Sequence, residues 1–196
     1  VELDESTPPV VEQDWLERTP FRSVAFPAVE PLSYIGRLTT GSSFCTASLV
    51  GRRLALTNAH CVTDYESGED WTFARGKNPN DLDLTFSGFA APDMVNVLDY
   101  DTHLGRDWSG EPAEDWAILY LDRHPIQRGW LGWLDDPGAT MQRTHRIMLG
   151  GYSGDLNDGE YLTLHYDCPA NKAGSRLRYR CERAPGSSGS PILLAE

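Results

Sequence analysis

Short apolar runs, separated by glycines and polar turns, dominate the hydrophobic pattern of the chain. Runs of about four to eight residues bounded by turn signals are typical of strands, and amphipathic helices need longer periodic segments. A single short helical turn is expected at 59–66. The expected strands are 34–40, 44–50, 52–58, 83–90, 116–122, 146–153, 160–168 and 175–181. Asn157, Asp158 and Gly159 lie between two of these runs and predict a hairpin.

The expected strands fall into two groups, separated by a stretch that lacks strand periodicity. Prolines interrupt the first part of the chain, where they disfavour both helices and central strands. The predicted units are an irregular lead-in at 1–32, a first strand unit at 33–125, a linker at 126–140 and a second strand unit at 141–196. The polar, turn-rich segments 64–81 and 91–114 are predicted to be surface loops. The pattern therefore predicts an all-β protein of two small antiparallel barrels or sandwiches.

Charge and hydropathy exclude several classes of partner. The formal net charge is −12, so the overall field repels nucleic acid and anionic membrane surfaces. No apolar run approaches the roughly 20 residues that span a bilayer. The N-terminal residues are acidic and contain prolines, unlike a signal peptide, so an exported form is expected to have lost its signal already.

The four cysteines form two local pairs that lie far apart in the chain. They are Cys45, Cys61, Cys168 and Cys181. Neither pair has the C-x₂-C spacing of a zinc site. Free buried thiols are one interpretation, but two local disulfides fit the spacing better and imply an oxidising compartment. A secreted or periplasmic protein is therefore expected.

Three short segments carry candidate chemistry. They are LTNAHC at 56–61, DWAIL at 115–119 and GSSGSP at 186–191. Each alone has an ordinary explanation, because a lone histidine, a turn aspartate and a flexible Gly/Ser loop are all common. The other histidines (His103, His124, His145 and His165) share no metal-ligand spacing, and no metal or cofactor is predicted.

Together the three segments resemble the signatures of the chymotrypsin/trypsin-like serine peptidases. These signatures are Ala-His-Cys, an Asp-x-Ala-Leu-like segment and Gly-x-Ser-Gly-x-Pro, and the order His60, Asp115, Ser188 is the order of that family. The nucleophile segment, with Gly151-Tyr152, is similar to the bacterial glutamyl-endopeptidase-like branch. The resemblance covers roughly 33–196 and implies two antiparallel six-stranded β-barrels with the active site between them.

The resemblance also implies a role for each of these residues. His60 is expected to act as general base and acid, and Asp115 to orient it, for nucleophilic attack by Ser188. The backbone N–H groups of Gly186 and Ser188 are expected to form the oxyanion hole. The family also implies the disulfide pairs Cys45–Cys61 and Cys168–Cys181.

Glu182 occupies the position that lies at the base of the primary pocket in this family. A buried carboxylate there favours substrates with Arg or Lys before the scissile bond. The alternative is a solvated Glu182, or one paired internally beside Arg183.

The sequence departs from the family pattern in two places. The trypsin-type branch has an aspartate before the nucleophile, which pairs with a newly freed N-terminal amine, but this chain has Ser187. The sequence also stops at Glu196, so the second barrel is expected to be incomplete in this chain. A C-terminal fragment of the same protein is the expected partner chain, and a shortened chain is the alternative.

The resulting hypothesis is a serine endopeptidase that acts on protein or peptide substrates. Two alternatives use the same fold: a catalytically silent binding protein, and an esterase with the same triad. Asp64, Glu66, Glu69 and Asp70 form an acidic loop that is expected to be solvated, with a calcium site as the alternative.

Overall fold

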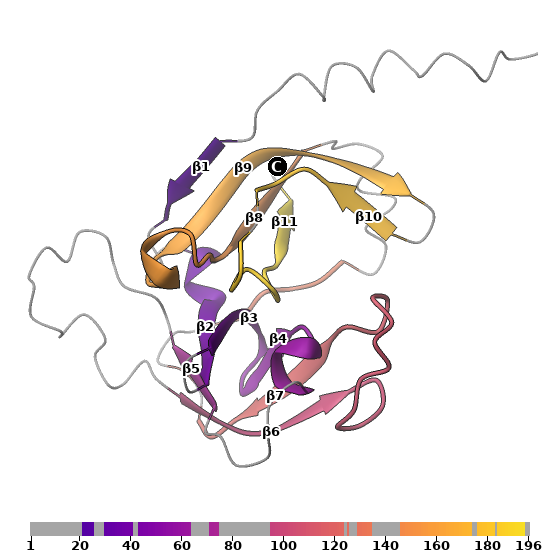
Figure 1. Ribbon diagram of the computed structural model, residues 1–196. Helices are drawn as coiled ribbons and strands as arrows, with labels where there is room; N and C mark the ends of the chain where they lie inside the picture. The colour runs from indigo at the N-terminus through magenta and orange to yellow at the C-terminus, as the bar shows by residue number, and fades with distance from the viewer. Residues whose placement is uncertain are drawn as a thin grey trace, which may run out of the picture.

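The computed structural model describes most of the two predicted strand units. The described residues are 21–25, 30–40, 43–63, 71–74, 95–123, 125, 129–134, 146–173, 176–182 and 184–194. Short antiparallel strands dominate them, and the α-helix among them, α2 (His60–Thr63), has a single turn (Figure 1). The prediction of an all-β protein is confirmed.

Six strands form a closed barrel in the N-terminal part of the chain. Closure leaves no unpaired sheet edge, and each strand pairs with an antiparallel neighbour on both sides. In barrel order the strands are β2 (Ile35–Thr40), β3 (Ser43–Gly51), β4 (Leu54–Thr57), β7 (Ala117–Leu121), β6 (Val95–Thr102) and β5 (Trp71–Ala74).

The barrel interior is filled by residues that alternate along the strands. Ala55 and Thr57 of β4 are buried, and so are Ala117, Leu119 and Leu121 of β7. Successive strand side chains point to opposite faces, so this period of two places one apolar face inside the barrel. Cys61 and Val62 of α2 join the same core, which fixes the helix against the end of the barrel.

Five further strands form an open sheet that constitutes the partial second barrel. Its order is β1-β9-β8-β11, with β10 paired to β9. The strands are β1 (Phe21–Val24), β8 (Arg146–Tyr152), β9 (Leu162–Ala173), β10 (Arg176–Tyr179) and β11 (Ile192–Leu194). A turn that contains Asp158 and Gly159, both with positive φ, connects β8 to β9 as the predicted hairpin.

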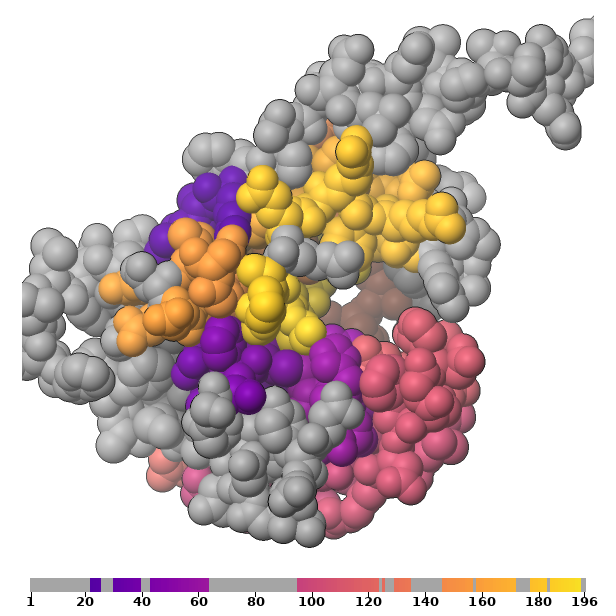
Figure 2. All heavy atoms as spheres, in the orientation of Figure 1, coloured from indigo at the N-terminus to yellow at the C-terminus, as the bar shows by residue number. Residues whose placement is uncertain are grey.

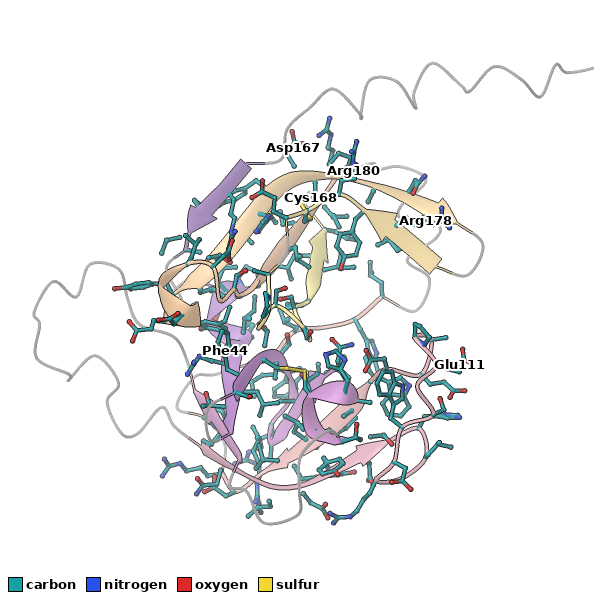
Figure 3. All side chains as sticks on the ribbon, in the orientation of Figure 1. Phe44, Glu111, Asp167, Cys168, Arg178 and Arg180 are labelled. Carbon is teal, nitrogen blue, oxygen red and sulfur yellow. A yellow bond between two sulfur atoms is a disulfide. The ribbon has the colours of Figure 1, made fainter. Side chains whose placement is uncertain are left out.

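The barrel and the second sheet share one packed interface. Ile35 of β2 and Phe44 of β3 belong to the same hydrophobic cluster as Tyr152, Leu162 and Leu164 of the second sheet. Phe44 lies where the two sheets meet (Figure 3). This shared cluster fixes the two sheets relative to each other, and hence the two sides of the cleft described below.

Three strands lie where the sequence indicated irregular structure. The loop predictions were wrong for β5, within 64–81, and for β6, within 91–114. Polar residues are interspersed along β6, and its only buried residues are Val95 and Thr102 at its two ends, so it lacks an apolar run. β1 lies within the predicted lead-in and pairs with β9. The expected strand at 83–90 and the acidic loop fall outside the described residues.

Candidate active site

His60 and Asp115 are brought together by the pairing of β4 with β7. Thr57 lies opposite Ala117 in this antiparallel pair, so the end of β4 lies beside the start of β7. His60 follows β4 at the start of α2, and Asp115 precedes β7. The His60 Nδ1 atom lies 2.8 Å from Asp115 Oδ2, and the backbone N–H of His60 donates to Asp115 Oδ1 at 3.0 Å. Both carboxylate oxygens therefore hold the histidine.

The geometry of this pair defines the histidine tautomer. An ionised carboxylate only accepts hydrogen bonds, so Nδ1 must carry the proton that it shares with Asp115. The side chains are 33% and 16% exposed for His60 and Asp115, respectively, so the ring keeps an open side while the carboxylate is largely covered. Trp108 packs near the imidazole, with ring centroids 5.9 Å apart. In the neutral form of this ring the other nitrogen, Nε2, carries no proton, and it lies 3.8 Å from Cys61 Sγ.

Asn58 connects the aspartate to the serine segment, a role that the sequence analysis missed. Its amide donates to the backbone carbonyl of Asp115 at 2.7 Å. Its carbonyl oxygen accepts a short hydrogen bond from the backbone N–H of Gly189, the residue after Ser188. One side chain thus ties the ends of β4 and β7 to the Ser188 loop. A polar residue two positions before the histidine was the only signal in the sequence.

The loop that carries Ser188 makes two consecutive turns. The N–H of Ser187 donates to the carbonyl of Ala184, and the N–H of Ser190 donates to the carbonyl of Ser187, both at 3.2 Å. Gly186 has a φ of +92°, which is unfavourable for a residue with a Cβ. A Cβ at this position would also collide with the Phe44 ring. Glycine at 186 is therefore required by both the turn and the packing.

Thr46 of β3 fixes the same loop from the first barrel. Its N–H donates to the carbonyl of Ser188 at 2.8 Å, and its hydroxyl donates to the carbonyl of Gly186 at 3.0 Å. The hydroxyl oxygen also accepts the N–H of Tyr152 at 2.9 Å. Thr46 is fully buried, so these hydrogen bonds are shielded from water.

Ser188 and the His60–Asp115 pair line the same cleft of about 560 Å³. On the face shown in Figure 2, the surface is hollowed between the yellow C-terminal segment and the pink 95–121 region. No hydrogen bond joins Ser188 to His60 among the described residues. The structure thus places all three predicted residues at one cavity, with the histidine paired to the aspartate.

Both disulfides are present, and one of them anchors the histidine. Cys45 of β3 is bonded to Cys61 of α2, the residue after His60. Cys168 of β9 is bonded to Cys181. The described residues hold one cluster of potential metal ligands, formed by Cys45, His60 and Cys61. Because both sulfur atoms are committed to the disulfide, this cluster lacks the thiolates that a metal requires.

Replacing both Cys45 and Cys61 by alanine is expected to lower the free energy of unfolding by about 3 kcal/mol. The bond closes a loop with a sequence separation of 16 residues, and a cross-link of that length restricts the unfolded chain by roughly this amount. Guanidinium unfolding of the variant and the wild type measures the difference. An unchanged midpoint and slope would contradict the expectation.

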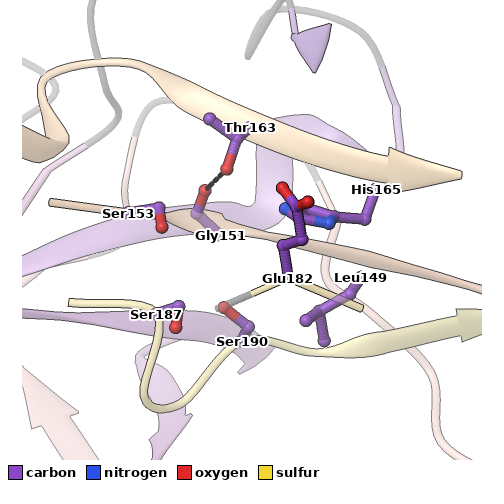
Figure 4. A pocket seen from close by; sticks show the side chains of 8 residues that line it. All are labelled: Leu149, Gly151, Ser153, Thr163, His165, Glu182, Ser187 and Ser190. Atoms are coloured by element: carbon purple, nitrogen blue, oxygen red, sulfur yellow. Dashed lines mark hydrogen bonds between the residues drawn. The ribbon is translucent and has the colours of Figure 1, made fainter. Parts of the chain in front are cut away.

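Glu182 lies beside a second, much smaller cavity of about 10 Å³, which Ser187 and Ser190 also line (Figure 4). It is exposed, and it does not line the large cleft. His165 faces it from β9 and is buried. Burial lowers the pKa of His165, and the nearby Arg22 cation lowers it further. The imidazole is therefore neutral near pH 7.

A closed barrel, a partial second barrel and a paired histidine and aspartate facing a serine loop define the class of the chymotrypsin-like serine peptidases. A model of the trypsin-like peptidase domain matches residues 41–196, and the chain belongs to the trypsin-like peptidase family. No helix among the described residues has the length and apolar character needed to cross a bilayer.

Known proteins support the same assignment. Serine protease 23 of Bos taurus is 27% identical over 185 residues, covering 84% of this chain and 46% of the relative. The Mus musculus protein of that name is 28% identical over 181 residues, with the same coverage. The chain therefore spans about half the length of the curated relatives it matches.

Similarity to solved structures is at the level of the fold. A Glu endopeptidase in complex with MPD has a TM-score of 0.66 and 22% identity, covering 88% of this chain and 79% of that chain. Human heparin binding protein has a TM-score of 0.61 and 13% identity, and the match covers 88% of this chain and 78% of that chain.

Proposed function

We propose that this chain is the catalytic part of a serine endopeptidase with His60, Asp115 and Ser188 as its triad. The observation that carries the proposal is the His60–Asp115 pair, joined at 2.8 Å, on the same cleft as Ser188. Asp115 holds the Nδ1 proton, so Nε2 is left to accept the proton of the Ser188 hydroxyl. Apo enzymes often lack the short serine–histidine contact until substrate binds, so the open geometry is compatible with this role.

The proposed reaction proceeds through an acyl-enzyme. Ser188 Oγ attacks the scissile carbonyl carbon while its proton passes to His60 Nε2. The carbonyl oxygen becomes an oxyanion, for which the N–H groups of Gly186 and Ser188 are the proposed donors. His60 then gives its proton to the leaving amine. Water, activated by the same histidine, hydrolyses the ester and regenerates Ser188.

Digestion of casein, followed by mass spectrometry of the products, tests the endopeptidase proposal. Internal cleavage at discrete bonds is expected, and it should be lost in Ser188→Ala. Turnover of simple esters without any cleavage of casein would support the alternative that the protein is an esterase. Inertness of the folded protein towards both substrates would support a binding role.

We also propose that Glu182 influences the residue preferred before the scissile bond. Its side chain is exposed, so a cationic substrate side chain is proposed to pair with it from the solvent side and not inside the small cavity, which has room for about one water molecule. Arg22 already lies close enough for Glu182 to raise its pKa, so part of this charge is compensated within the protein. The expected preference for Arg or Lys is correspondingly modest.

Chromogenic peptides with Arg, Glu, Phe or Ala before the scissile bond measure this preference. The Arg peptide is expected to have the highest kcat/KM, and Glu182→Gln should remove its advantage. Equal cleavage of all four peptides, or an advantage that survives in Glu182→Gln, would exclude Glu182 as the determinant.

The two disulfides support secretion or a periplasmic location, where oxidising conditions preserve such bonds. A partner chain that supplies further strands of the second barrel stays a prediction from the sequence.

A further inference from the structure

An ion pair with a covered arginine and a half-exposed aspartate joins β1 to the turn after β8. Arg22 of β1 donates from Nη1 to Asp155 Oδ2 at 2.6 Å and from Nη2 to Asp155 Oδ1 at 2.7 Å. The Arg22 side chain is only 12% exposed, and Asp155 is 48% exposed. Such two-point pairs are the stronger and more directional type of ion pair. The proposed reaction assigns no role to either residue.

The turn that contains Asp155 contacts the Ser188 loop directly. The Ser153 hydroxyl donates to Asp155 Oδ1 at 2.8 Å, which fixes the turn internally. Between them, Gly154 donates its N–H to the carbonyl of Pro185 at 2.7 Å. A Cβ at Gly154 would lie 3.0 Å from that carbonyl oxygen, so the two backbones are in close contact. Movement of the turn would therefore displace Pro185, the residue before Gly186.

The Ser188 loop is consequently supported from two sides, and Asn58 of the barrel also holds it through the N–H of Gly189. On one side Thr46, fixed in the closed barrel, holds Gly186 and Ser188. On the other side Gly154 holds Pro185, and the conformation of its turn depends on the hydrogen bonds of Asp155. Gly186 lies between these supports and has the positive φ that glycine tolerates.

The charges around the pair keep it ionised. The hydrogen bond from Arg22 is the main reason that the pKa of Asp155 lies far below its usual range. The pKa of Arg22 is raised, chiefly by the same bond. Among the described residues, the other ionisable groups that face the pair are Glu182, which raises the pKa of Arg22, and His165, which is buried and opposite Arg22 in the β1–β9 pair.

We propose that Arg22 is a positioning residue for the Ser188 loop, acting through Asp155 and Gly154. The inference rests on the proposed function of that loop. The Ser187 hydroxyl donates to the carbonyl of Ala184, within the loop itself. Arg22 holds Asp155 from β1, so the order of the loop depends on the docking of β1 on β9.

Kinetics of Arg22→Ala, Arg22→Lys and Asp155→Asn test this role. Because small displacements of a catalytic group cost up to about 10²-fold in rate, we expect Arg22→Ala to lower kcat about 10-fold or more with little change in KM. Lysine keeps the charge but lacks the two-point geometry, so the kcat of Arg22→Lys is expected to lie between those of the wild type and Arg22→Ala. Methylguanidinium added to Arg22→Ala should restore part of the lost kcat.

Arg146→Ala is the matched control, because Arg146 pairs with Asp167 in the same sheet and its side chain is similarly covered, at 20% exposed. This variant is expected to lose stability but to keep its kcat. A wild-type kcat in Arg22→Ala, or an equal loss of kcat in Arg146→Ala, would overturn the proposal. If Arg22→Ala fails to fold, Asp155→Asn, which preserves side-chain volume, gives the same comparison.

Hydrogen exchange separates this inference from the proposed function, since it needs no activity. In Ser188→Ala protein, Arg22→Ala is expected to accelerate exchange of the Ser187 and Ser190 amides, which close the loop turns. Absence of catalysis in the wild type together with this acceleration would refute the function and support the positioning role. Unchanged exchange in an active protein would refute the positioning role alone.

Discussion

Ser188→Ala is expected to lower kcat for peptide hydrolysis by about 10⁴-fold or more, because removing the nucleophile of a triad eliminates the covalent route. The cleft and the His60–Asp115 hydrogen bond remain, so KM is expected to change little. Steady-state assays with a chromogenic peptide measure both constants, and circular dichroism checks the fold.

Ser187→Ala is the informative comparison, because it removes the adjacent hydroxyl. That hydroxyl is committed to the carbonyl of Ala184, so its loss should affect the shape of the loop and leave the nucleophile in place. A much smaller decrease in kcat is therefore expected. Equal losses in the two variants, or an active Ser188→Ala protein, would contradict the assignment of the nucleophile.

Asp115→Asn is expected to lower kcat by about 10⁴-fold at neutral pH. Both carboxylate oxygens accept hydrogen bonds, one from the His60 ring and one from its backbone N–H. An amide offers only one accepting oxygen, so its NH₂ group must face one of these donors. If the NH₂ group faces Nδ1, the imidazole proton moves to Nε2, and the ring can no longer accept the Ser188 proton.

The pH dependence of kcat for Asp115→Asn and for Asp101→Asn checks this prediction. Asp101 accepts a hydrogen bond from Tyr120 on the exposed side of the barrel and serves as the control. The control variant is expected to retain the wild-type profile. Wild-type kcat in Asp115→Asn would show that Asp115 does not set the histidine tautomer.

The sequence predicted the strands whose burial pattern is simple. The apolar run at 116–122 contains β7, and those at 44–50 and 146–153 correspond to β3 and β8. β6 was missed because much of its surface faces solvent and carries aspartates, so hydrogen bonding to β5 and β7 outweighs its weak strand pattern. Such pairing depends on residues that are distant in sequence, which local patterns do not reveal.

In the candidate site, too, local motifs were visible in the sequence and long-range contacts were not. Short motifs predicted His60, Asp115 and Ser188 as the triad, because the residue types and their order are typical of that chemistry. The supports of these residues could not be identified in this way. Thr46 and Asn58 act through backbone groups more than 100 residues away, and Arg22 and Asp155 are 133 positions apart. Their roles follow from tertiary contacts and leave no local motif.

Labelling with a fluorophosphonate, read by intact mass and peptide mapping, tests the central claim most directly. Such probes form a stable bond to a serine only when a neighbouring base activates its hydroxyl. One adduct per molecule is predicted, located on Ser188, absent from Ser188→Ala and formed much more slowly in His60→Ala and Asp115→Asn. A folded protein that remains unlabelled, or that carries its adduct on another residue, would contradict the account.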